Sequence, residues 1–194
     1  MEYLIRDFFD SQAILSEEEW QFFKSCLIKR EFKKGDTILK EGDTENYLSF
    51  NIEGISRMFI INANGSDISL GFAFPNDFIC EYSSFILRKP TKYNIECLED
   101  CTMYCISYEN LNKAYSISQT GERLGRINAE YFNIYLLERN VSLLTENAEQ
   151  RYLNLMQKDK KIAQKIALKH IASYLGITPE SLSRIRKNFT ISIS

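Results

Sequence analysis

Residues Ile166–Lys187, IALKHIASYLGITPESLSRIRK, carry the pattern around which this chain is organised. From Leu168 to Leu175, apolar residues recur at i, i+3, i+4 and i+7, which predicts a helix with one apolar face. Gly176 follows where helices commonly end in a left-handed residue. Thr178 offers a hydroxyl N-cap and Pro179 a first helical residue, so a second helix is predicted there. Two short helices around a glycine turn indicate a helix-turn-helix, with an ordinary helical hairpin as the alternative.

This segment resembles the helix-turn-helix of the Crp/Fnr family of bacterial transcription regulators. Ala172 stands where that motif has a small residue, Gly176 stands at its turn, and the inward positions hold Ile177, Leu182 and Ile185. The resemblance, which covers most of the chain, implies a sequence-specific regulator that binds double-stranded DNA. The DNA-binding residues that we expect are Lys169, Thr178, Pro179, Glu180, Ser181, Ser183, Arg184 and Lys187.

Base readout is expected from the second helix. By resemblance, Glu180 and Arg184 match the family's base-reading glutamate and second arginine, whereas Pro179 replaces the first arginine. The chemistry agrees, because arginine forks onto guanine O6 and N7 and glutamate accepts from cytosine N4. Lys187 is expected to contact phosphate.

The distribution of charge supports a nucleic-acid partner. Residues 151–188 hold nine Lys or Arg against Asp159 and Glu180, a net charge of +7. Because the whole chain carries −2, the remainder carries −9. A basic module on an acidic body is expected of a DNA-binding protein, since phosphate neutralisation supplies most sequence-independent affinity.

Composition indicates an ordinary globular protein. The 194 residues are 44% hydrophobic and 26% charged, which allows one or two domains. Glu2, Arg6 and Asp7 interrupt any N-terminal apolar run, so we expect a cytoplasmic protein with no membrane partner. The five cysteines include Cys97, Cys101 and Cys105 at even spacing, which we interpret as buried structural thiols rather than a metal site.

The first half of the chain predicts helices followed by short strands. Residues 4–29 have a helical pattern, with a capping box formed by Ser16 and Glu19. From Arg30, aromatic and β-branched segments alternate with glycine turns, which indicates a sandwich or jelly-roll barrel. The succession FKKGDTILKEGD, YLSFNIEGISRMFI, NGSDISLGFAFPNDFI and ECLEDCTMYCIS is similar to the cyclic-nucleotide-binding β-roll of the same family.

A long helical stripe is predicted over residues 116–156. Such a seam can pack against its twin as a parallel coiled coil, or only against its own barrel. The resemblance implies the first, and therefore a homodimer. The seam residues that we expect are Ile127, Tyr131, Ile134, Leu137, Val141 and Leu144.

The effector pocket departs from the family pattern. The family binds a cyclic phosphate through a glycine turn, a glutamate and an Arg-Ser pair. Glu81 matches the glutamate, but Cys80 replaces the glycine, and Thr91 and Lys92 stand where Arg-Ser is expected. The pocket residues that we expect are Glu81, Ser83, Thr91 and Lys92, and we predict a small-molecule effector other than cyclic AMP.

Enzymatic function is not expected. The chain holds a single histidine, His170, which we interpret as a surface residue or a neighbour of the DNA backbone. No glycine-rich phosphate loop or nucleophile motif occurs, and no metal or cofactor is predicted.

The predicted fold class is α+β. A β-roll sensor with N-terminal helices spans 1–115, a dimerisation helix 116–156 and a helix-turn-helix domain 157–194. The last residues, FTISIS, leave room for one strand at most, so the family's wing is expected to be short or absent. The resemblance also implies contact with RNA polymerase. The alternative is a ligand-binding or protein-interaction module of the same fold that has lost DNA binding.

Overall fold

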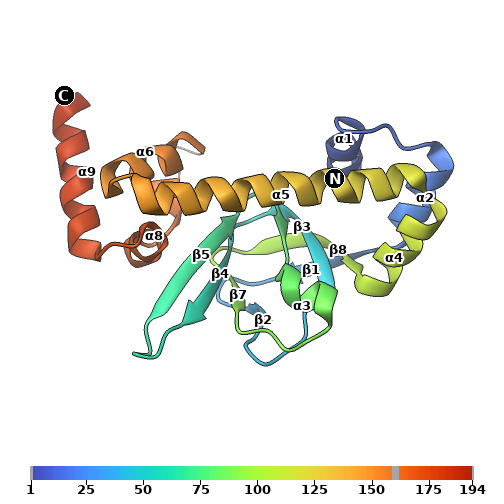
Figure 1. Ribbon diagram of the computed structural model, residues 1–194, viewed down its shortest axis with the longest axis horizontal. Helices are drawn as coiled ribbons and strands as arrows, with labels where there is room; N and C mark the ends of the chain where they lie inside the picture. The colour runs from blue at the N-terminus through green and yellow to red at the C-terminus, as the bar shows by residue number, and fades with distance from the viewer. Residues whose placement is uncertain (1, 159–161, 194) are drawn as a thin grey trace. The chain divides into compact units, whose positions relative to one another are not determined.

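The structure, a computed structural model, describes residues 2–158 and 162–193. All strands of this described part lie between residues 27 and 107, preceded by two helices and followed by a helical C-terminal half (Figure 1). The prediction that the chain contains both helices and strands, with antiparallel sheets in the N-terminal part, is confirmed.

The strands form two four-stranded sheets, in the orders β1-β8-β3-β6 and β2-β7-β4-β5. The strands are β1 (Leu27–Phe32), β2 (Thr37–Leu39), β3 (Tyr47–Glu53), β4 (Ser56–Ile61), β5 (Asp67–Ala73), β6 (Phe78–Ile79), β7 (Asn94–Cys97) and β8 (Cys101–Ser107). Pairing is antiparallel between β8 and both β1 and β3, between β3 and β6, and between β2 and β7.

Helices precede and follow this β region in the sequence, and one, α3, lies within it. They are α1 (Glu2–Asp10), α2 (Glu17–Ser25), α3 (Tyr82–Leu87), α4 (Tyr108–Ile117), α5 (Gln119–Thr145), α6 (Ala148–Lys158), α7 (Ile162–Lys165), α8 (Leu168–Leu175) and α9 (Pro179–Ile193). The helical prediction for residues 4–29 is right for α1 and α2 but wrong from Leu27, where β1 begins and pairs with β8.

The thiols predicted to be structural are core residues. Cys97, Cys101 and Cys105 are almost fully buried and pack with Ile95 and Met103. A small apolar side chain suits such a site, since burial needs no hydrogen-bond partner for a thiol.

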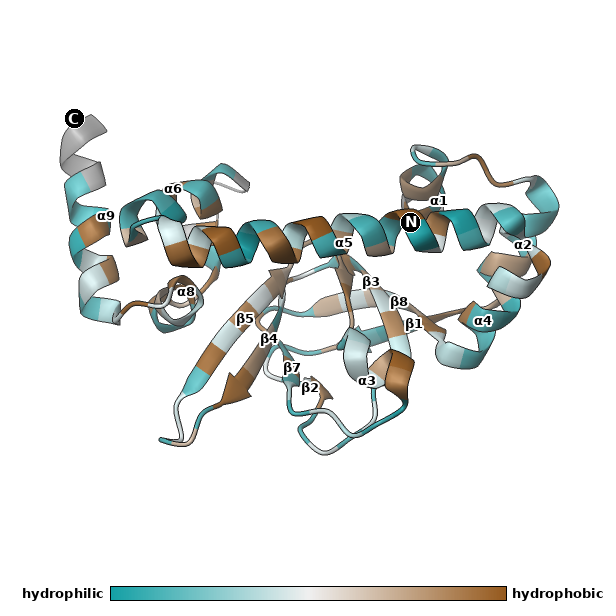
Figure 2. Ribbon diagram, viewed as in Figure 1, coloured by the Kyte–Doolittle hydropathy of each residue, from teal (hydrophilic) through white to brown (hydrophobic). Residues whose placement is uncertain are grey.

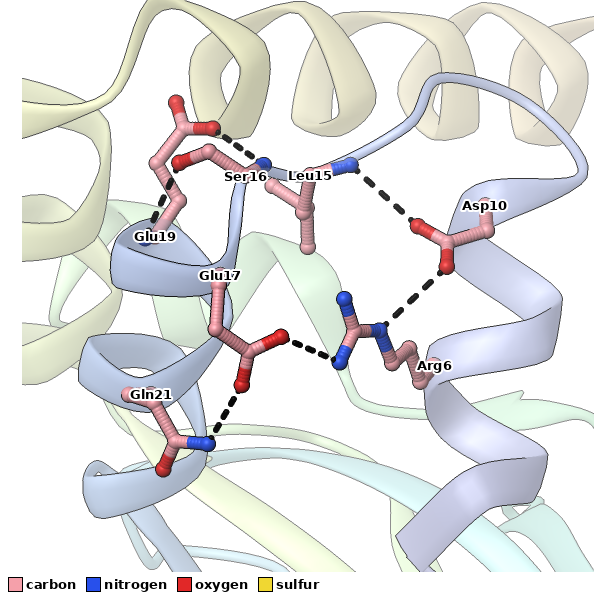
Figure 3. Close-up of polar contacts among 7 residues, drawn as sticks. All are labelled: Arg6, Asp10, Leu15, Ser16, Glu17, Glu19 and Gln21. Carbon is pink, nitrogen blue, oxygen red and sulfur yellow. Dashed lines mark hydrogen bonds and ion pairs between the residues drawn. The ribbon is translucent and has the colours of Figure 1, made fainter.

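Polar contacts fix the turn between α1 and α2 (Figure 3). Ser16 and Glu19 form the predicted capping box, with each side chain accepting from the other's backbone N–H. Asp10 accepts from the Leu15 N–H at 3.2 Å, and Arg6 donates to Glu17 at 2.8 Å. Glu19 also accepts from the Ser118 hydroxyl, and this hydrogen bond lowers the pKa of Glu19.

The chain divides into two compact units. One comprises residues 1–58 and 72–132, and the other comprises residues 59–71 and 133–194. The hairpin of β4 and β5 and the long helix α5 both continue from one unit into the other.

The single helix predicted over residues 116–156 is interrupted twice. Ser118 is extended, and its hydroxyl accepts from the Gly121 N–H at 2.7 Å, so α5 begins after it. Asn147 accepts from the Gln150 N–H at 2.9 Å and begins α6. An N-cap followed three residues later by Gln is a capping-box pattern, and it is the signal in the sequence that locates this second break.

Among the described residues, none of the helices combines the length and the apolarity that spanning a bilayer requires.

Candidate nucleic-acid interface and effector site

The turn between α8 and α9 is closed by a Schellman motif. Gly176 is left-handed, with φ +70°, and its N–H donates to the Ser173 carbonyl at 3.1 Å. The Ile177 N–H reaches back to the Ala172 carbonyl at 3.0 Å. These two bonds satisfy carbonyls that a helix end otherwise leaves without an intrahelical partner.

The second helix begins as the sequence predicts. The Thr178 hydroxyl accepts from the Ser181 N–H at 3.2 Å, and Pro179 is the first helical residue. Leu182 is fully buried and Ile185 half-buried, so they form the inner side. The expected DNA-binding residues are exposed, except Ser181, which is half-buried.

Glu180 is available as an acceptor at the start of α9. A hydrogen bond from its own backbone N–H lowers the pKa of its carboxyl, so the side chain is ionised near neutrality. Arg184 lies one turn further along and is exposed. The two side chains predicted to read bases are therefore neighbours on one exposed face.

The expectation for His170, a surface residue or a neighbour of the DNA backbone, is wrong. His170 is buried at 7% exposure in α8, because it lies on the side of the helix that also buries Ile171 and Tyr174. The segment from Phe189 to Ile193, in which one strand at most was expected, continues α9 as helix. A lone strand would leave its N–H and C=O groups unpaired, whereas continued helix pairs them internally.

Arginines from two other helices hold the last carbonyls of α8. Arg139 of α5 donates to the Tyr174 carbonyl at 2.6 Å, and its guanidinium lies 3.7 Å from the centre of the Tyr174 ring. Arg151 of α6 donates to the Leu175 carbonyl at 2.9 and 3.2 Å. The two arginines, Tyr174 and Leu175 are among the residues that line a groove of about 530 Å³. Sequence reasoning missed both arginines, since nothing local marks a residue that contacts a carbonyl 24 or 35 positions away.

The hairpin of β4 and β5 also contacts α8. The Ser173 hydroxyl donates to the Ser69 hydroxyl at 3.0 Å and accepts from the Ser69 N–H at 3.1 Å. Residues 59–71 belong to the same compact unit as α8.

The predicted seam on α5 is apolar and uncovered in the single chain. Figure 2 shows hydrophobic bands alternating with hydrophilic ones on α5. Ile127 is half-buried, and the other five predicted seam residues are exposed, from 51% at Ile134 to 85% at Leu144. Phe132, Leu136 and Leu143 are exposed on other faces of the same helix.

The side chain of Glu81, the residue matching the family's effector pocket, makes hydrogen bonds to residues next to it in the sequence. It is buried at 5% exposure and caps α3, accepting from the N–H groups of Ser83 and Ser84 at 3.1 and 2.9 Å. The exposed Ser83 also donates its hydroxyl to Glu81. The structure therefore brings these two predicted residues together.

Thr91 and Lys92 lie in a different turn. Thr91 is buried and exchanges backbone hydrogen bonds with the segment 42–43, and its hydroxyl accepts from the Tyr93 N–H at 2.9 Å. Lys92 is exposed. The hydroxyl of Thr91 is thus already used as an acceptor.

Two residues outside the expected pocket set lie near this site: Glu45, whose carboxylate accepts from the Glu81 N–H at 3.4 Å, and Arg88. Arg88 donates to the Glu45 carbonyl at 2.6 Å and to the Asn46 side chain, and it stacks over Tyr108 at 4.8 Å. Glu45 is buried at 6% exposure, and burial raises the pKa of its carboxyl. Burial first, and then the charges of Glu45 and Glu81, raise the pKa of the Cys80 thiol. Cys80 thus lies near the carboxyl groups of Glu45 and Glu81 as well as the guanidinium of Arg88.

Comparison with known proteins agrees with the β-roll. Residues 29–118 match the family model described as cyclic nucleotide-binding domain. No curated protein matches the chain.

Solved structures share the fold over most of the chain. FixK2 from Bradyrhizobium japonicum is 18% identical, with 86% of this chain and 85% of that chain covered and a TM-score of 0.73. A putative transcriptional regulator of the Crp/Fnr family from Eubacterium rectale is 20% identical, with 92% and 85% covered and a TM-score of 0.70. The c-di-GMP-responsive global regulator CLP of Xanthomonas campestris is 17% identical, with 91% and 93% covered and a TM-score of 0.69. The fold is thus that of Crp/Fnr regulators, built on a cyclic-nucleotide-binding-like domain.

Proposed function

We propose that this protein is a homodimeric, sequence-specific DNA-binding transcription regulator of the Crp/Fnr type. The observation that carries the proposal is the pair α8 and α9. A Schellman turn and a Thr178 cap fix the two helices, Leu182 anchors the second, and Glu180, Arg184 and Lys187 are exposed on it. An exposed helix of this chemistry suits the major groove.

Fluorescence anisotropy with random duplex DNA tests DNA binding. Because bound Lys and Arg release counterions, affinity should fall at least about a hundredfold between roughly 50 and 200 mM salt. Replacing both Lys169 and Lys187 by alanine should weaken binding, whereas Lys113→Ala, an exposed lysine on α4, should not. Absence of salt-dependent binding would favour the alternative, a ligand-binding or protein-interaction module that has lost DNA binding.

The dimer is proposed to form through α5. Ile127, Ile134 and Val141 are seven residues apart, as are Leu137 and Leu144, so they occupy a and d positions of a heptad. β-Branched residues at a with leucine at d favour a parallel two-stranded coiled coil. A parallel dimer would present two copies of α9 about one duplex turn apart, to a roughly palindromic site.

We further propose that the β-roll, within the sensor segment 1–115, responds to a small molecule other than cyclic AMP. A buried phosphodiester needs close donors, and charge-assisted arginine forks are the strongest of these. Here the Arg88 guanidinium is occupied by Glu45 and Asn46, and the Glu81 carboxylate is occupied by the start of α3. The buried carboxyl of Glu45 adds a group that repels an anion when it ionises.

Calorimetric titration with cyclic AMP and cyclic GMP tests the effector proposal. Binding tighter than about 10 μM by either nucleotide would overturn it. The proposed function also includes contact between the DNA-bound dimer and RNA polymerase in the cytoplasm. Transcription in vitro from a selected site, with and without the protein, tests that contact.

A further inference from the structure

The carbonyls at the end of α8 form a complete set of hydrogen bonds. A helix leaves its last four carbonyls without intrahelical partners. In α8 the Schellman turn satisfies Ala172 and Ser173, and the remaining two accept from arginines outside the helix. Arg139 comes from α5 and Arg151 from α6, so both bonds join α8 to helices that precede it.

The contacts of Arg139 are directional as well as electrostatic. Its guanidinium donates to the Tyr174 carbonyl at 2.6 Å and lies 3.7 Å from the centre of the ring of the same residue. The Tyr174 hydroxyl meets the Tyr135 hydroxyl of α5 at 3.3 Å. One residue of α8 is thus held at its carbonyl, ring and hydroxyl by a single turn of α5.

Arg151 fixes the same end of α8 from a second direction. It donates through Nε and Nη2 to the Leu175 carbonyl, and its Nη1 donates to the Glu146 carbonyl in the link between α5 and α6. A planar guanidinium that makes three such bonds holds one orientation, which a lysine ammonium cannot reproduce. The negative end of the α8 dipole adds to the attraction of both arginines.

We infer that Arg139 and Arg151 are positioning residues that set the orientation of α9 relative to α5, and so determine which half-site spacing the dimer accepts. This inference rests on the proposed function. In a parallel dimer, α5 defines the two-fold axis, and any tilt of α8 and α9 against α5 moves the two copies of α9 apart or together. One base pair of spacing changes the separation by about 3.4 Å and rotates the half-site by roughly 36°. A rigid attachment should therefore discriminate single base-pair changes.

Spacing selectivity tests the inference. Duplexes selected by the unaltered protein from a random pool give the half-site, and palindromes are then built with the spacer changed by one and two base pairs. The unaltered dimer should prefer one spacing at least about tenfold. Replacing Arg139 and Arg151 together by alanine should reduce that preference below about threefold, while binding to a single half-site stays within about threefold. The Ser69–Ser173 contact and the Schellman turn remain in this variant and hold α8 itself together.

The controls separate the possible failures. Arg126→Ala removes an arginine of α5 whose ion pair is with Glu130 on the same helix, and it should keep the original selectivity. Arg139→Lys keeps the positive charge but not the planar guanidinium, so we expect it to lose part of the spacing preference. This variant replaces the double variant if circular dichroism shows that the double variant does not fold. Unchanged spacing preference in a folded variant would refute the role of the arginines. Failure of the unaltered protein to bind DNA would refute the proposed function, and with it this inference.

Discussion

Leu137→Glu should convert the dimer into monomers. Leu137 occupies a d position of the α5 heptad and is 59% exposed in the single chain. Full burial of a leucine contributes about 1.5–3 kcal/mol, so covering this fraction contributes about 1–2 kcal/mol per chain. Two chains lose about 2–4 kcal/mol of dimer stability. Two facing carboxylates, desolvated without a cation, add a few kcal/mol. The dissociation constant should rise about a thousandfold or more.

Sedimentation velocity over a concentration series from about 0.1 to 100 μM measures this change. Leu136→Glu is the matched control, because it places the same charge on the neighbouring residue, itself 46% exposed. One step along a helix rotates a side chain by about 100°, which takes Leu136 off the seam. This control should remain dimeric. A monomeric unaltered protein at micromolar concentrations, or equal loss in both variants, would refute the assignment of the seam.

Three further predictions concern readout, the turn and a buried acid. Arg184→Ala should weaken DNA binding by about 1–3 kcal/mol and relax the preference at one G·C pair, whereas Lys187→Ala should weaken binding to all DNA sequences alike. Selection of bound duplexes from a random pool checks both variants. An unchanged selected motif for Arg184→Ala would contradict the first prediction. Gly176→Ala should lower the free energy of unfolding by about 1–2 kcal/mol in denaturant titrations, because its φ is +70° and a Cβ there meets no atom within 4 Å, so the cost is backbone strain alone. Gly176→Asn should cost less. Burial raises the pKa of Glu45, so its contribution to stability is present below its usual pKa of 4.5 and is lost as pH rises through the folded value. The Glu45→Gln variant should therefore become more stable to unfolding than the unaltered protein as pH rises above about 4.5. The charged or titratable groups near Glu45 are Arg30, Cys80 and Glu81. A difference in unfolding free energy that does not vary with pH would show that Glu45 does not titrate in this range.

The sequence alone determined the parts that depend on local backbone chemistry. A left-handed glycine, a hydroxyl cap and a first-turn proline predicted both helices around Gly176, because each acts on groups within four residues. The Ser16 capping box was predictable for the same reason. The alternation of short apolar segments with glycine turns predicted the sheets, although not their strand order.

Only the tertiary structure decided which polar groups are already engaged. Glu81 matches an effector residue in the sequence, yet it caps α3, and Glu45 is buried beside it by segments far away in the chain. The burial of His170 and the hydrogen bond from Arg139 to the Tyr174 carbonyl likewise depend on which helix faces are covered. Hydrophobic periodicity predicts that a face is apolar but not what packs against it. That is settled by contacts between distant segments, whose free energies are comparable with the local preferences they override.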